Sequence, residues 1–140
     1  MAGACGGMRR TVSTDDAPAA VGAYSQATAT EDLVFTAGQI PLTPEGDLLD
    51  GADVDVQTEQ ALENVEAVLA AAGADMGDVL KVTVYLDDID DFEAMNTVYE
   101  TFFDDDPPAR SAVQVGALPK GVAVEVEAVA AAPGAGDGDD

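Results

Sequence analysis

The residues best suited to chemistry lie near the end of the chain, where one arginine is followed by two glutamates. Arg110 is the only arginine outside an N-terminal pair, and its guanidinium offers a rigid, bidentate clamp for a carboxylate ligand. Glu125 and Glu127 lie in an otherwise apolar stretch, residues 122–130, in which the alternation of a strand places both carboxylates on one face. The pattern therefore predicts an anion clamp for a carboxylate ligand, together with two carboxylates on one face of the last strand.

An ion pair is the structural alternative for the same side chains. Arg110 would then neutralise Glu125 or Glu127 inside the fold and take no part in a reaction. The spacing of the three residues along the chain does not distinguish an ion pair from a ligand clamp. Both interpretations are therefore kept.

Two further segments carry weaker signals. Tyr24 and Ser25 follow a Gly-Ala pair and either supply hydroxyls to a site or serve core packing or a turn. Gly38 ends a short apolar run and is suited to bring a backbone N–H close to a ligand. The chain has no glycine-rich phosphate loop and no cluster of metal ligands. We therefore expect neither a metal nor a cofactor.

The composition excludes several classes of function. The 140 residues include no histidine, so a Ser-His-Asp triad and the usual His-containing zinc sites are excluded, and the single Cys5 cannot form an internal disulfide. Acidic residues number 28 against 5 basic ones, and the resulting net charge of −23 repels nucleic-acid phosphates. No apolar run approaches the roughly 20 residues that span a bilayer, and no signal-peptide core is present. We expect a cytoplasmic protein that binds neither nucleic acid nor a membrane.

The acidic residues are spread along the chain and form a shell instead of a block. Repulsion among them destabilises the compact state in dilute buffer. At molar salt the Debye length falls to about 3 Å, and most of this repulsion disappears. The composition therefore predicts a halophilic protein from a salt-rich cytoplasm.

The elements that position the candidate residues follow from the hydrophobic periodicity. Asp53 or Asp55 suits the start of a first helix, and Gly73 suits the position after its end. Asp90 or Asp91 suits the start of a second helix. The pattern predicts strands at residues 33–37, 79–86, 111–115 and 122–130, and helices at residues 55–72 and 92–103.

This order of elements predicts an α+β domain with two helices packed on one face of a mixed sheet. We assign residues 12–132 to the domain, residues 1–11 to a mobile extension and residues 133–140 to a disordered acidic tail. No further helix is available for the other sheet face, so we expect oligomerisation to cover it. With 26 alanines and 17 valines, the side chains are small enough for subunits to approach closely.

Several motifs in order along the chain resemble those of one family, the RidA family, across residues 12–132. The resemblance implies a chorismate-mutase-like α+β fold that assembles as a homotrimer with ligand sites in the clefts between subunits. The motifs are APAAVGAYSQA at residues 17–27, TAGQIP at 36–41, QALENVEAVL at 60–69, PARS at 108–111, LPK at 118–120 and VEVEA at 124–128.

The resemblance also implies an activity and a site. Members of the family hydrolyse reactive enamines and imines, such as 2-iminobutanoate and 2-iminopropanoate, to 2-keto acids and ammonia without a cofactor. By this resemblance Arg110 binds the substrate carboxylate and Glu125 orients or activates water. Tyr24, Gly38 and Asn96 correspond to positions that line or shape the cleft. The ligand would be a small imino or keto acid.

Three positions depart from the family pattern. Ala23 replaces a proline, Ala37 stands where active relatives often carry serine, and Ala112 stands where many carry cysteine. A non-catalytic trimer that binds a small carboxylate as a sensor or regulator is therefore the alternative function. RNA hydrolysis, attributed to some relatives, is disfavoured by the acidic shell. Chaperone-like binding of unfolded chains has little support.

Overall fold

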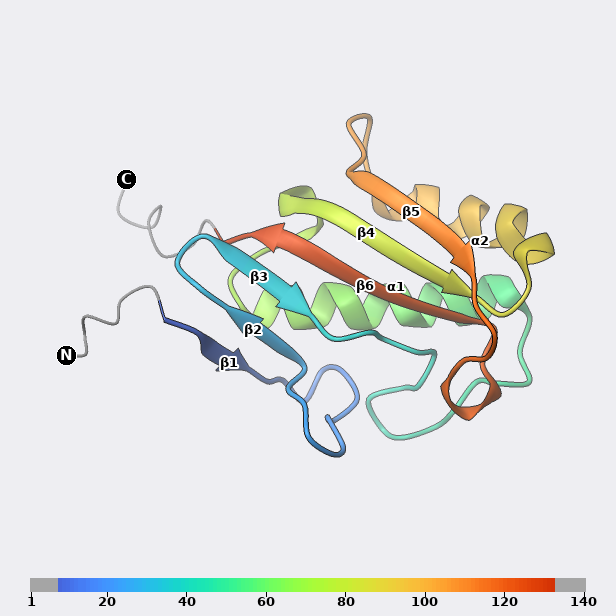
Figure 1. The fold of residues 1–140 in the computed structure, drawn as a ribbon, viewed down its shortest axis with the longest axis horizontal. Coiled ribbons are helices and arrows are strands. Elements are labelled where there is room, and N and C mark those ends of the chain that lie inside the picture. Colours follow the sequence, from blue (N-terminus) through green and yellow to red (C-terminus); the bar gives the residue numbers. More distant parts are fainter. Residues whose placement is uncertain (1–7, 133–140) are drawn as a thin grey trace.

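The computed structural model describes residues 8–132. A six-stranded mixed sheet forms one layer, and two helices pack against one of its faces (Figure 1). The sheet order is β1-β2-β3-β6-β4-β5; β4 and β5 are parallel, and every other neighbouring pair is antiparallel. The elements are β1 (Arg10–Val12), β2 (Ala27–Ala29), β3 (Leu33–Thr36), α1 (Val54–Ala71), β4 (Val79–Leu86), α2 (Phe92–Tyr99), β5 (Ala109–Gln114) and β6 (Val124–Ala131).

The alternation of β6 decides which of its side chains are buried. Val124 and Val126 are buried beneath the helices, whereas Glu125 and Glu127 are half-buried on the opposite face. This confirms the predicted division of the last strand. β6 lies inside the sheet, between β3 and β4. Its side chains on both faces therefore lie away from the sheet edges.

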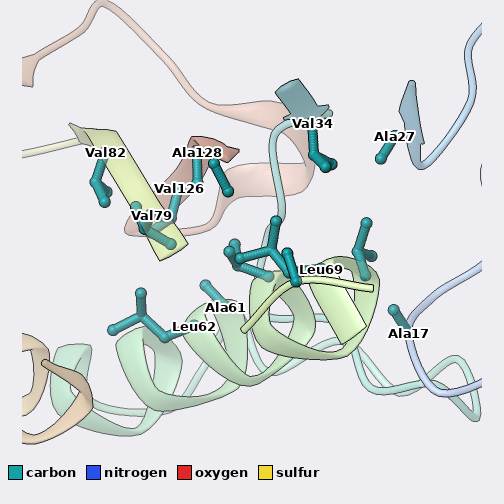
Figure 2. Close-up of a cluster of buried hydrophobic side chains, with 14 of the residues drawn as sticks. Ala17, Ala27, Val34, Ala61, Leu62, Leu69, Val79, Val82, Val126 and Ala128 are labelled. Atoms are coloured by element: carbon teal, nitrogen blue, oxygen red, sulfur yellow. The ribbon is translucent and has the colours of Figure 1, made fainter. Parts of the chain in front are cut away.

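The core consists of small and medium aliphatic side chains between α1 and the sheet. Leu62 and Leu69 of α1 lie beneath the strands that carry Val82 and Val126 (Figure 2), and all four are at most 1 % exposed. α1 also packs against α2, so that the two helices form a continuous layer. Close packing of many valines and alanines keeps the two layers close together.

The predicted helices and the four predicted strands are confirmed, with ends displaced by a few residues. α1 begins after Asp53 and is followed by Gly73, whose φ of +87° suits glycine. The Asp53 side chain makes no capping hydrogen bond to the helix. α2 ends at Tyr99 and continues as a 3₁₀ turn at Glu100–Phe102.

The strands β1 and β2 were not predicted from the sequence, and one predicted boundary is corrected. Arg10 and Thr11, assigned to a mobile extension, form β1 with Val12 by pairing with Ala27–Ala29. A strand of three residues is too short to show a period, and its ladder partner is distant in sequence. Residues 1–7 of the predicted extension and the predicted tail at 133–140 lie outside the described residues.

Neither helix of residues 8–132 has the length and apolar character that crossing a membrane requires. Within the same residues, no group of three or more potential metal ligands occurs.

Candidate functional site

Glu125 lies on the helix-free face of the sheet, where the segment after β3 passes close to it. The backbones of Gln39 and Val126 exchange two hydrogen bonds, of 2.7 and 2.9 Å. The Thr36 hydroxyl accepts a bond of 3.0 Å from the N–H of Ala128. These contacts hold Gly38 against the Glu125 side chain. A Cβ at position 38 would collide with the carboxylate oxygen Oε2 and lie 2.8 Å from Cδ, so this close approach requires glycine.

A cavity of about 580 Å³ opens beside this contact. Glu125, Gly38 and Tyr24 all line it. Its remaining lining is largely apolar and includes Val21 and Ile40. Tyr24 is 54 % exposed, which excludes the alternative role of this residue in core packing.

Buried amides hold the two loops that form the cavity. Gln26, only 3 % exposed, donates to the carbonyls of Ala17 and Pro18, at 3.3 and 2.7 Å. Asn64 of α1 donates to the carbonyls of Ile40 and Leu42, at 3.1 and 2.9 Å. Because these buried amides satisfy backbone groups that water cannot reach, the loops have defined positions.

The surroundings of Glu125 favour its protonated form more than water does. Burial raises the pKa of Glu125 above its ordinary value, and the charge of Glu127 raises the pKa further. Tyr85 of β4 donates a hydrogen bond of 2.9 Å to Oε2 of Glu127. This bond orients the Glu127 carboxylate, two residues from Glu125 on the same face. A carboxyl with a raised pKa is suited to accept and return a proton.

Arg110 is held by neutral groups on the helix-covered side of β5. Its Nη1 donates a hydrogen bond of 2.6 Å to Oδ1 of Asn96, and its guanidinium carbon lies 4.6 Å from the ring centre of Tyr99 and 5.2 Å from that of Phe92. Asn96 in turn donates to Glu100, at 3.1 Å. Burial raises the pKa of Tyr99, and the Arg110 charge lowers it in part.

The side chains around Arg110 border a second cavity of about 390 Å³, which Asn96 and Tyr99 also line together with the carboxylates of Glu100 and Asp104. Across residues 8–132, Arg110 forms no ion pair, so the structural alternative of a pair with Glu125 or Glu127 is not observed. The cation stays available for an anionic ligand.

The structure therefore divides the predicted site residues into two groups. Arg110 is in register with Val82, which faces the helices, whereas Glu125 is in register with Tyr85 on the opposite face. Tyr24 and Gly38 accompany Glu125, and Asn96 accompanies Arg110. Within one chain the predicted clamp and the predicted base do not share a cavity.

Sequence reasoning missed the supporting roles of three aromatic residues. Phe92 and Tyr99 of α2 both lie against the Arg110 guanidinium. Phe92 and Tyr99 are seven residues apart with Asn96 between them, so all three lie on one face of the helix. This spacing is the pattern in the sequence that predicts a common contact for the three side chains, which we call the Arg110 cradle. The contact of Tyr85 with Glu127 could not be predicted from the sequence, because it depends on the pairing of β4 with β6.

Comparison with known proteins agrees with this architecture. The endoribonuclease L-PSP family model matches residues 14–132. A RutC family protein of Pyrococcus horikoshii is 48 % identical, over 88 % of this chain and 98 % of the relative. A 2-iminobutanoate/2-iminopropanoate deaminase of Rattus norvegicus is 46 % identical, over 88 % of this chain and 90 % of the relative.

Solved structures give the same result for the fold. The crystal structure of Escherichia coli TdcF with bound serine superposes with a TM-score of 0.83 at 44 % identity, and covers 87 % of this chain and 98 % of its own. Its six-stranded α+β architecture is the one described above. The chain belongs to the endoribonuclease L-PSP family, which is the RidA family that its motifs resemble.

Proposed function

We propose that the protein hydrolyses 2-imino acids, such as 2-iminobutanoate and 2-iminopropanoate, to 2-keto acids and ammonia. Relatives named for this deaminase activity are 44–46 % identical to the chain over most of its length. The observation that carries the proposal is the Arg110 cradle: in a chain of net charge −23, this arginine is held by an amide and two rings. Its direct contacts are neutral, and this supports a role for its charge in binding the carboxylate of a ligand.

The chemistry requires few groups. A protonated imine already has an electrophilic carbon, so a metal and a histidine are unnecessary. Arg110 would bind the substrate carboxylate, and Glu125 would take a proton from water as its oxygen attacks the C=N carbon. Glu125 then returns this proton to nitrogen, and takes the proton of the new hydroxyl group as the C–N bond breaks. The C=O bond of the keto acid forms, and ammonia leaves together with the remaining proton as ammonium. Positioning supplies most of the acceleration.

We propose further that the site is completed in a homotrimer. Arg110 and Glu125 face opposite sides of the sheet in one chain, so a cleft between subunits is the arrangement that lets both contact one ligand. The helix-free face supports this, because Phe35 and Val113 are 47 % and 43 % exposed on it. The mass of the assembly in molar salt, measured by light scattering, tests the trimer. A monomer that is fully active would contradict it.

A coupled assay at molar salt tests the activity. A dehydratase generates 2-iminobutanoate, semicarbazide traps it, and the protein diverts the imine to keto acid if the proposal holds. Absence of diversion at every salt concentration would contradict the deaminase proposal.

The second candidate is a trimer that binds a small carboxylate without catalysis, as a sensor or regulator. The relative with bound serine shows that a protein of this fold takes up a small amino acid. Ala37 also lacks the hydroxyl that active relatives often place beside the cleft. Saturable binding of 2-oxobutanoate without imine hydrolysis would favour this candidate. RNA hydrolysis, which the family name suggests, is disfavoured by the acidic surface.

A further inference from the structure

Lys120 has an unusual backbone conformation for its residue type. Its φ of 59° and ψ of 18° lie in the left-handed region, and among residues 8–132 it is the only non-glycine with a positive φ. A left-handed conformation is disfavoured for a residue with a Cβ, and is adopted most easily by Gly, Asn or Asp. Position 120 carries a lysine and none of these three residues. Strain of this kind clusters at functional positions, so its position needs explanation.

The strained turn lies at the cavity that contains Glu125. Pro119 and Lys120 line this cavity together with Tyr24 and Gly38. Lys120 is exposed and is the only basic residue in the lining, and Glu125 is the only acidic one. The turn itself is held by bonds of 3.3 Å from Gly121 to Leu118 and from Val122 to Pro119.

The negative net charge of the protein makes the positive charge of Lys120 important for binding an anion. An anionic substrate that approaches a chain of net charge −23 is repelled, and the cavity itself contains a carboxylate. Only Lys81, Arg110 and Lys120 are basic beyond the first ten residues. Arg110 lies on the other side of the sheet, so it does not offset the negative potential at this entrance within the same chain.

We propose that Lys120 is a second recognition residue for the anionic substrate, which guides the carboxylate into the cavity of Glu125 and lowers KM without taking part in the chemical step. The inference rests on the proposed function. It differs from the clamp role of Arg110, because Lys120 is an exposed point charge at the entrance and not a stacked, bidentate group. A charge of this kind accelerates association and loses its effect as salt rises.

Four variants test the proposal. Lys120→Gln removes the charge and keeps the strained backbone, while Lys120→Arg keeps the charge. Lys120→Asn removes the charge with a residue that tolerates the left-handed conformation. Arg9→Gln is the matched control, since Arg9 is exposed and its loss changes the net charge equally. Each variant is assayed with 2-iminobutanoate, and is titrated with the product 2-oxobutanoate.

We expect Lys120→Gln and Lys120→Asn to lower kcat/KM about three- to tenfold at the lowest salt at which the protein stays folded, with kcat unchanged. The loss should shrink to less than about twofold near 1 M salt. Lys120→Arg should retain the wild-type kcat/KM. Lys120→Asn should melt a few degrees above Lys120→Gln, because the strain is relieved.

Equal kcat/KM and equal 2-oxobutanoate affinity in Lys120→Gln and Arg9→Gln would overturn the inference. If the wild type hydrolyses no imine but binds 2-oxobutanoate, the deaminase proposal fails, and the same comparison of affinities still decides the role of Lys120. If the wild type neither hydrolyses nor binds, both are wrong.

Discussion

Arg110 is held by contacts that leave its charge uncompensated. Asn96 accepts one hydrogen bond from it and two rings lie against it, so the guanidinium is oriented while its other donors stay available. Glu100 and Asp104 line the same cavity as Arg110, but neither forms an ion pair with it among the described residues. The neutral cradle therefore favours the clamp over the ion pair.

Arg110→Ala should raise KM about 10- to 150-fold and change kcat less, because hydrogen bonds to charged groups contribute about 1.5–3 kcal/mol. Arg110→Lys should give an intermediate KM, since lysine keeps the charge but loses the planar, stacked geometry. Steady-state kinetics at molar salt measures both. An unchanged KM in Arg110→Ala would exclude the clamp.

Glu125→Gln should mainly lower kcat, since the amide cannot take a proton. In the wild type, kcat/KM should rise with pH through the raised pKa of Glu125, because only the ionised carboxylate acts as a base. The pH–rate profile of the variant should lack this rise. A kcat equal to that of the wild type would remove Glu125 from the mechanism.

The difference in stability between the wild type and the same variant should depend on pH in a defined direction. Below the ordinary value of 4.5, Glu125 is protonated in both states and its burial is tolerated. As pH rises through the raised folded-state pKa, the folded protein must ionise a half-buried carboxyl and loses stability. Glu125→Gln removes this loss. The unfolding free energy of Glu125→Gln minus that of the wild type should increase from about pH 4.5 upward. This difference should become constant above the folded-state pKa of Glu125, as measured by denaturant titration at constant salt.

The segment after β3 and the strand β6 act as one unit. Two backbone hydrogen bonds between Gln39 and Val126 bring Gly38 so close to Glu125 that any side chain at position 38 must displace the carboxylate. The position of the Glu125 carboxylate is thus set by a segment distant in sequence. Variation in this segment should change catalysis more than stability.

Gly38→Ala should lower kcat by up to about 100-fold, because a displacement of about 1 Å in a catalytic group has this effect. Gly51→Ala is the matched control, since a Cβ there meets nothing within 4 Å. Circular dichroism and melting curves establish that both variants fold. Equal activity in the two would show that the close contact with Glu125 has no catalytic role.

The elements were more predictable than their contacts. α1, β4 and β6 each have a clear period over eight or more residues, so local sequence determines them. β1 and β2 have three residues each, and only their mutual pairing makes them strands. The same distinction applies to the candidate site, because Arg110 and Glu125 could be chosen as candidates from the chain, whereas their orientation depends on strand register.

The charge of the molecule should make its stability depend on salt. With 28 acidic residues and 5 basic ones, screening of mutual repulsion stabilises the folded state as salt rises. We expect the melting temperature to rise steadily from dilute buffer to molar KCl. NaCl should act equally if screening is the cause. A melting temperature that is the same throughout would exclude the halophilic assignment.

The sequence by itself determined the composition of the acidic shell, the amphipathic period of α1 and the two faces of β6, because these depend on residues adjacent along the chain. The tertiary structure decided that Arg110 and Glu125 face opposite sides of the sheet, that Gly38 touches Glu125 and that Lys120 borders the same cavity. Each of these depends on pairing between distant segments: β4 with β5, residue 39 with residue 126, and the turn at 119–121 with the loops across the cavity. Local periodicity carries no information on such register, which is set only when the layers pack.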